Sequence, residues 1–122
     1  MTKAVRGAIQ VGQNDKRSIH SAALRLVSEI LKANAISLER IISIMFSLTV
    51  DLDAGNPATG LREAGFVETP LFCVQEAAVE GGMARVIRTL VTFDGAARRK
   101  VTAIYLDGAE SLRPDISQGS QA

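Results

Sequence analysis

The first residues of the chain alternate between two kinds of position with a period of two. Residues 3–11 place Arg6 on one face, between small alanines, and Val5 and Ile9 on the other. This alternation is typical of a β-strand, in which successive side chains point to opposite faces. Because its neighbours on that face are small, Arg6 also has room beside it for a bound group.

The next segment has the period of a helix. Between residue 16 and residue 33, apolar side chains recur every three or four positions, at Ile19, Ala23, Leu26 and Ile30. This spacing predicts an amphipathic helix with one buried stripe. Asn14 or Asp15 supplies the side-chain oxygen that caps such a helix, and Asn34 is expected to end it. A short helical turn is expected at residues 37–40.

The rest of the chain predicts mostly strands. Residues 41–49 are apolar on both faces, which predicts a strand covered on both sides. Asn56 followed by Pro57 has the pattern of an N-cap and a first helical residue, so a short helix to about Ala64 is expected. Further strands are predicted at residues 69–76, 84–93, 101–106 and 110–113, with a turn at Gly81-Gly82. This order indicates an α+β domain in which one long and one short helix pack on a mixed β-sheet.

Length and composition narrow this interpretation. A chain of 122 residues is expected to form a single domain over residues 1–116, with a flexible C-terminal tail at residues 117–122. Hydrophobic residues make up 47% of the chain and aromatic residues only 4%, so part of the aliphatic surface is expected to pack against other subunits.

A formal net charge of +1 disfavours a nucleic-acid partner. The sequence contains no signal-peptide pattern and no apolar run of about 18 residues, so a cytoplasmic protein without a membrane interaction is expected.

Arg88 is the residue that most needs an explanation. Within the apolar segment 86–93 it shares a strand face with Leu90, where an arginine must either reach water or find a partner. Glu76, at the end of the preceding predicted strand, is a candidate partner, and Arg6 raises the same question on its own strand. The residues alone therefore leave two interpretations open, a structural ion pair and a small-anion pocket lined by arginines.

Other enzyme signals are missing or weak. Cys73 is the only cysteine, so neither an intrachain disulfide nor a thiolate zinc cluster can form. His20 lies within the predicted long helix and is expected at its surface. Tyr105 is expected at the edge of the core with its hydroxyl in water. The chain has no phosphate-binding loop, no dinucleotide-binding glycine motif and no metal-ligand spacing.

A set of short motifs nevertheless follows a recognisable order along nearly the whole chain. From the N-terminus they are Val5-Arg6-Gly7-Ala8, Asp51-Leu52, Pro57-Ala58, Cys73-x-Gln75-Glu76, Gly81-Gly82, Ile87-Arg88, Tyr105-Leu106 and Leu112-Arg113-Pro114-Asp115. Each motif is weak alone, but together they resemble the monofunctional chorismate mutases of the Bacillus type, the AroH class. The resemblance implies a homotrimer with a pseudo-α/β barrel core and active sites between adjacent subunits.

The resemblance also implies an activity and a set of site residues. The expected reaction converts chorismate to prephenate in aromatic amino acid biosynthesis, and this rearrangement needs no metal or cofactor. Arg88 matches the arginine that reaches the ether oxygen, Arg6 the arginine that holds a carboxylate, and Glu76 the carboxylate that accepts the ring hydroxyl. The other positions assigned to substrate binding are Tyr105, Cys73, Arg62, Arg113, Phe72, Ala58 and Leu112.

Two positions depart from the family's pattern. The family commonly has Phe where this chain has Asn56, and Lys where it has Thr59, which predicts a more open and less positive entrance. Two alternatives therefore stay open, a non-catalytic trimeric module that binds a small carboxylate metabolite and an oligomer whose arginines and Glu76 form a structural ion network. A structural network would not need Tyr105 at the family's position, so the enzyme is the favoured interpretation.

Overall fold

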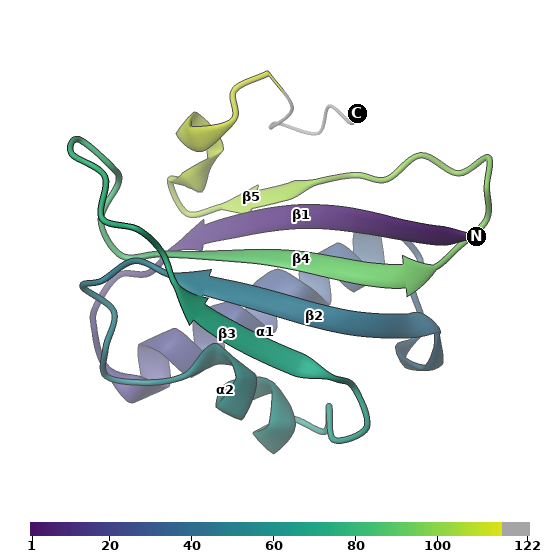
Figure 1. The fold of residues 1–122 in the computed structure, drawn as a ribbon, viewed down its shortest axis with the longest axis horizontal. Coiled ribbons are helices and arrows are strands. Elements are labelled where there is room, and N and C mark those ends of the chain that lie inside the picture. The colour runs from purple at the N-terminus through teal and green to yellow at the C-terminus, as the bar shows by residue number, and fades with distance from the viewer. Residues whose placement is uncertain (116–122) are drawn as a thin grey trace.

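One mixed β-sheet organises the computed structural model, which describes residues 1–115 (Figure 1). Its strands are β1 (Thr2–Gln10), β2 (Ile41–Leu48), β3 (Leu71–Gln75), β4 (Val86–Asp94) and β5 (Ile104–Leu106). The helices are α1 (Lys16–Ala33) and α2 (Pro57–Glu63), with short 3-10 turns at Leu38–Arg40 and Ala109–Leu112. The predicted tail at residues 117–122 lies outside the described residues. The expected α+β class, with one long and one short helix on a mixed sheet, is confirmed.

The strand order places β4 at the centre of the sheet. The order is β3-β2-β4-β1-β5, so β3 and β5 are the two edges. β4 runs antiparallel to β1 and β2, whereas β1 with β5 and β2 with β3 are parallel pairs. The register sets Arg88 opposite Ala8 on one side and opposite Ser47 on the other. Arg88 therefore lies on the central strand, close to the end of the sheet at which β1 and β2 finish.

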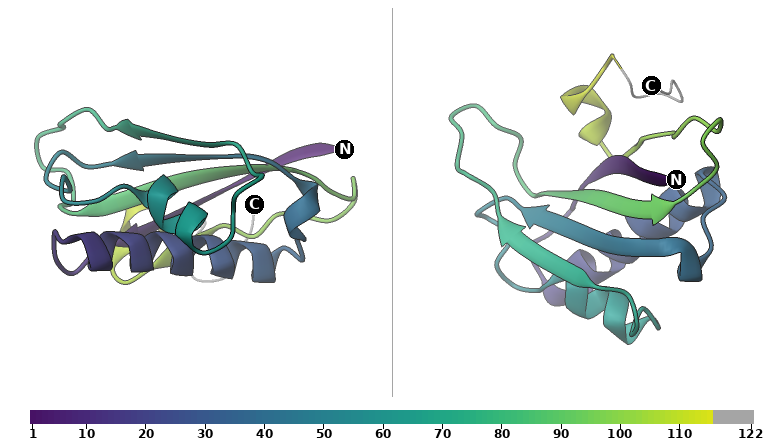
Figure 2. Two further views of the ribbon diagram at one scale, coloured as in Figure 1. Left: turned by 90° about the horizontal axis from the view of Figure 1, so that it is seen from below. Right: turned by 45° about the vertical axis from the view of Figure 1, so that its right-hand side comes forward.

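The helices cover only one face of the sheet, as the edge-on view in Figure 2 shows. Asp15 begins α1 by accepting a hydrogen bond from the Ser18 amide at 2.7 Å, and Asn34 caps its end. The predicted apolar stripe is buried, with Val27 added to it. This stripe packs on strand residues that point to the same side, namely Val5, Ile9, Ile44, Phe46, Ile87 and Val91. Across residues 1–115, no helix is both long enough and apolar enough to cross a lipid bilayer.

The opposite sheet face is left open, which corrects the expectation for residues 41–49. Met45 is 44% exposed, so β2 is not covered on both sides within one chain. Met45 pairs with Phe72 on β3 and with Leu90 on β4, which are 61% and 42% exposed. Since directly paired residues share a sheet face, these three side chains form one apolar row. We call Met45, Phe72, Val74 and Leu90 the open apolar face.

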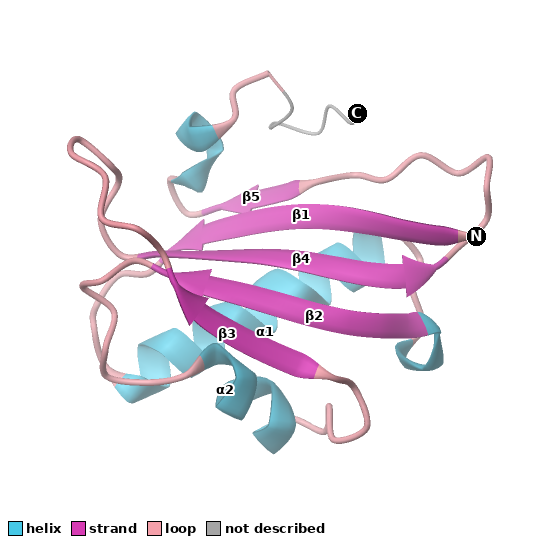
Figure 3. Ribbon diagram, in the orientation of Figure 1, coloured by secondary structure: helices cyan, strands magenta, loops and turns pink. Residues whose placement is uncertain are grey.

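Two further expectations are wrong near the C-terminus (Figure 3). Residues 110–113 were expected to form a strand, but Ala109–Leu112 is a 3-10 turn. It follows Gly108, whose φ of 103° is a conformation that glycine adopts readily. The strand predicted at residues 101–106 is shorter, because only Ile104–Leu106 pairs with β1.

His20 is also not the surface residue expected from its helix. Its side chain is 12% exposed. Nε2 accepts a hydrogen bond from the Asn56 amide at 3.3 Å, and Nδ1 lies 3.2 Å from Oε1 of Glu63. Gly60 makes this packing possible, since a Cβ there would lie 2.9 Å from the Cα of His20. His20 therefore helps to join α1 to α2.

Candidate active site

The open face carries a second row of paired residues, and this row is polar at its centre. Arg88 on β4 lies between Ser47 on β2 and Ala8 on β1, and Ala8 in turn pairs with Tyr105 on β5. Val74 pairs with Ser47 at the other end of the row. Ala8 is buried and lies between Arg88 and Tyr105, and Tyr105 and Leu112 pack around it.

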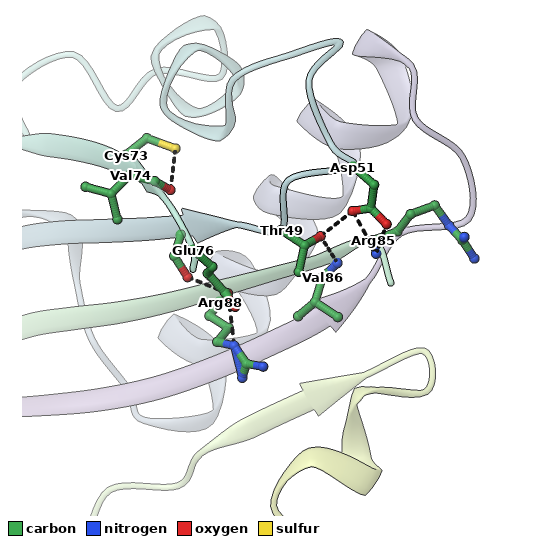
Figure 4. Close-up of polar contacts among 9 residues, drawn as sticks. Thr49, Asp51, Cys73, Val74, Glu76, Arg85, Val86 and Arg88 are labelled. Atoms are coloured by element: carbon green, nitrogen blue, oxygen red, sulfur yellow. Dashed lines mark hydrogen bonds and ion pairs between the residues drawn. The ribbon is translucent and has the colours of Figure 1, made fainter. Parts of the chain in front are cut away.

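Glu76 joins this row from the end of β3, as the close-up in Figure 4 shows. Arg88 donates through Nε to Oε2 of Glu76 at 2.9 Å, and Ser47 Oγ donates to the same oxygen at 2.7 Å. The Glu76 amide is itself fixed by the Leu48 carbonyl at 2.8 Å. Side-chain exposure is 43% for Arg88 and 20% for Glu76. The contact is therefore a partly desolvated ion pair at the surface of a hollow, and the predicted pairing of these two residues is confirmed.

That hollow is a cavity of about 460 Å³ at the end of β2 and β3. Three predicted site residues line it, namely Glu76, Arg88 and Leu112. Most of the remaining wall belongs to the segment from Ala77 to Ala84, which leads from Glu76 back to β4. This loop therefore closes one side of a cavity whose charged lining residues are Glu76, Arg88 and Asp51.

Arg6, Tyr105 and Arg113 lie on the β1 and β5 side of the same face. Arg6 is exposed and pairs with Leu90, the next residue on the open face after Arg88. Arg113 donates from Nε and Nη2 to the two carboxylate oxygens of Asp115 at 3.1 and 2.9 Å. These hydrogen bonds hold the pKa of Asp115 below its ordinary value, and Arg6 contributes in the same direction. Arg113 therefore binds the Asp115 carboxylate directly, and Arg6 acts on it only through its charge.

The remaining predicted residues lie elsewhere in the chain. Phe72 and Cys73 are on the edge strand β3, and Ala58 and Arg62 are on α2 beside it. Cys73 packs against the core side of the sheet, so its thiol points away from the Arg88 face (Figure 4). Burial raises the pKa of this thiol. Within one chain, the structure does not bring these four residues to Glu76 and Arg88.

Sequence reasoning missed Ser47. A serine inside an apolar strand has no distinguishing local pattern, and its importance follows only from the register that sets it opposite Arg88. Thr49 and Asp51 were also missed as supporting residues. Asp51 was noted only as part of a motif, although its carboxylate accepts two hydrogen bonds from the Arg85 amide at the start of β4.

The chemistry available at this site is electrostatic. A guanidinium stays charged at every physiological pH, and its planar set of donors can bind two oxygens at once. The terminal nitrogens of Arg88 make no hydrogen bond with any residue in the range 1–115. The fold and the site therefore define a small α+β protein with an arginine and carboxylates in the wall of a cavity on its sheet.

Comparison with known proteins agrees with this description. Residues 2–116 match the family model for chorismate mutase type I. The chain is 36% identical over 118 residues to the chorismate mutase AroH of Thermus thermophilus, covering 95% of this chain and 97% of that protein. It is 31% identical over 119 residues to the chorismate mutase AroH of Bacillus subtilis, covering 96% and 94%. A chorismate mutase structure from Clostridium thermocellum superposes with a TM-score of 0.83 at 33% identity, covering 89% of this chain and 98% of that one. The chain belongs to the type I chorismate mutase family.

Proposed function

We propose that this protein converts chorismate to prephenate, and that Arg88 carries the electrostatic part of the catalysis. The observation that supports this most directly is the Arg88–Glu76 pair in the wall of the cavity, with the Arg88 terminal nitrogens left without a partner among residues 1–115. In the reaction, one C–O bond of the substrate breaks while a C–C bond forms within the same molecule. No proton, nucleophile or cofactor takes part, so the protein has to supply position and charge.

In this proposal, the residues that stabilise the charge of the transition state differ from those that position the substrate. Negative charge builds up on the ether oxygen as the C–O bond breaks, and a fixed guanidinium beside it stabilises that transition state. Arg88 would serve there, because Glu76 already orients it through Nε and leaves the other donors available. Glu76 would also accept the hydrogen bond of the substrate's ring hydroxyl. In this assignment the Arg88–Glu76 ion pair takes part in catalysis and is more than a structural ion network.

Arg6 and Tyr105 would hold the side chain of the substrate over its ring. Restraining a flexible substrate in its reactive conformation removes part of the entropic barrier. Arg113 and Leu112 would close the same side of the site. Arg113 binds Asp115 in the structure, so a substrate carboxylate that uses Arg113 would have to replace the Asp115 carboxylate.

We further propose that the site is completed by another copy of the chain in a homotrimer. Phe72, Cys73, Ala58 and Arg62 belong to the β3 and α2 edge, while Tyr105 belongs to the opposite edge. Residues at two opposite edges of one sheet can meet in a single cleft when copies of the chain assemble edge to edge. The open apolar face supports assembly as well, because it leaves large side chains exposed in the middle of the sheet.

The test is a direct assay with a matched control. Purified protein should consume chorismate and form prephenate, and Arg88→Ala should lower kcat by about 100-fold to 1,000-fold, the effect of removing a main transition-state donor. Arg17→Ala removes an exposed arginine from α1 and should leave the rate unchanged. Turnover that survives Arg88→Ala would contradict the mechanism. Chorismate binding without turnover in the unaltered protein would instead support the non-catalytic carboxylate-binding module.

A further inference from the structure

The chain enters β4 through an unusual backbone conformation. Arg85, three residues before Arg88, has a φ of 53°. This left-handed region is unfavourable for residues other than glycine, and it persists only where surrounding contacts hold it. The segment before it offers little restraint of its own, since residues 77–82 are exposed and include Gly81 and Gly82. The contacts of Arg85 therefore decide where β4 begins.

Asp51 and Thr49 hold the backbone amides of Arg85 and Val86 (Figure 4). Both carboxylate oxygens of Asp51 accept from the Arg85 amide, at 3.2 and 3.1 Å. Thr49 Oγ1 donates to Asp51 Oδ1 at 2.6 Å and accepts from the Val86 amide at 3.0 Å. The backbone of Thr49 also donates to the Val86 carbonyl at 3.1 Å. Two consecutive amides of the β4 entry are thus held by one carboxylate and one hydroxyl.

The other side of Arg85 is fixed to the chain that follows β1. The Val11 amide donates to the Arg85 carbonyl at 2.7 Å, and Arg85 Nε donates to the Val11 carbonyl at 2.8 Å. Arg85 is therefore held between the end of β1 and the loop after β2. These are the two strands that flank β4.

We propose that Asp51 is a positioning residue, which sets the place of Arg88 in the active site by holding Arg85 and Val86. The proposal rests on the proposed function, because it assigns Asp51 a role in that reaction. The loop from Ala77 to Ala84 joins Glu76 to the β4 entry, so a shift of Arg85 changes the position of Arg88 relative to Glu76 in the cavity wall. Asp51 also lines the cavity, but in this proposal it touches neither substrate nor reacting atoms. It acts through the backbone.

The charge state of Asp51 is consistent with this role. The Thr49 hydroxyl, and after it the Arg85 amide, hold the pKa of Asp51 below its ordinary value, and the Arg85 guanidinium adds to the effect. These hydrogen bonds use both oxygens of Asp51, and only the ionised carboxylate offers both as full acceptors. They are therefore complete at neutral pH and are lost as the pH falls through the lowered pKa.

The experiment compares Asp51→Ala with Asp53→Ala. Asp53 lies two residues further along the same loop, is exposed, and accepts from Asn14 instead of from β4. Asp51→Ala should lower kcat by about tenfold to 100-fold, the scale expected when a catalytic group is displaced by about 1 Å. KM should change less, because Arg6 and Tyr105 stay in place. Asp53→Ala should leave both constants near their original values.

A second variant and a second measurement separate positioning from folding. Thr49→Val keeps the shape of the side chain but removes the hydroxyl between Asp51 and Val86, so it should give a smaller loss of kcat in the same direction. Amide hydrogen exchange at Arg85 and Val86 should accelerate in Asp51→Ala but not in Asp53→Ala. Circular dichroism identifies any variant that fails to fold, in which case Thr49→Val decides the outcome.

The possible failures are distinct. Turnover that depends on Arg88 but falls equally in Asp51→Ala and Asp53→Ala, or a change in KM alone, overturns the positioning role and leaves the proposed function standing. No turnover in the unaltered protein overturns the proposed function and this proposal with it. Unchanged exchange at Arg85 and Val86 in Asp51→Ala also overturns the positioning role, whatever the rate.

Discussion

Ser47 and Arg88 lie directly opposite each other on β2 and β4, and both donate to the same oxygen of Glu76. One oxygen thus receives two donors from two neighbouring strands, which fixes the carboxylate against the sheet. The second oxygen of Glu76 receives neither of these hydrogen bonds. Glu76 can therefore orient Arg88 and still offer an acceptor toward the cavity.

Ser47→Ala should weaken this arrangement without removing any charge. Loss of one hydrogen bond to the carboxylate corresponds to about 1 kcal/mol, or about fivefold in kcat/KM. Ser43→Ala is the matched control, because Ser43 is another half-buried serine of β2 but pairs with Thr92. Steady-state rates on chorismate provide the comparison. Equal effects of the two substitutions would show that Ser47 does not act through Glu76.

Gly7→Ala should disturb the edge strand that carries Tyr105. A Cβ at residue 7 would lie 2.8 Å from the carbonyl oxygen of Ile104 and 2.8 Å from Cδ1 of Ile30. The short strand β5 would have to move, at a cost in unfolding free energy of about 1–3 kcal/mol, and KM should rise as Tyr105 shifts. Gly12→Ala is the control, since within residues 1–115 no heavy atom beyond its two chain neighbours lies within 4 Å of a Cβ there. Thermal unfolding and substrate titration measure the two effects, and an unchanged melting temperature for Gly7→Ala would refute this account.

Leu90→Glu should disrupt assembly and leave the fold of one chain intact. Leu90 is 42% exposed in the middle of the open apolar face, so a carboxylate there is tolerated in water but not in a dry interface. Sedimentation velocity should show a smaller species than the unaltered protein at equal concentration. Leu38→Glu changes another exposed leucine, in the 3-10 turn before β2, and should leave the species unchanged. Identical sedimentation of all three proteins would contradict assembly through the open face.

Asn56→Phe, which restores the residue common in the family, should lower stability. Asn56 Oδ1 accepts from the Ala58 amide at 2.8 Å and caps α2, and loss of a helix N-cap costs about 1 kcal/mol. Asn56→Asp keeps an acceptor at the cap and should retain the melting temperature. Differential scanning calorimetry distinguishes the two variants. A Phe variant as stable as the unaltered protein would mean that the cap contributes little.

Elements whose cause is local could be predicted from the sequence. The 3.6-residue stripe and the Asp15 cap define α1 by themselves, and Asn56-Pro57 defines the start of α2. β5 could not be bounded in this way, because its extent depends on pairing with β1 instead of on its own pattern. Residues 110–113 resemble a strand in their alternation, but the preceding Gly108 turns the chain into a 3-10 turn.

The same distinction, between features with a local cause and features that depend on strand pairing, applies to the candidate site. The pairing of Arg88 with Glu76 could be foreseen, because a charged residue on an apolar strand face needs a partner. The role of Ser47 and the contacts of Asp51 could not be foreseen, since both depend on which strands become neighbours. The orientation of Cys73 toward the core also follows from the sheet and not from the motif that contains it.

The separation of predicted site residues between the two edges of the sheet has a consequence for mixed populations of chains. In the proposed assembly, a chain altered at Arg62 damages the site of its neighbour, whereas a chain altered at Tyr105 damages a site built on its own β5 edge. Two such inactive proteins, unfolded and refolded together, would regenerate some intact sites in the mixed particles. By contrast, a mixture of unaltered chains with only one of these variants would lose one site for each altered chain, so activity would fall in simple proportion to the share of altered chains.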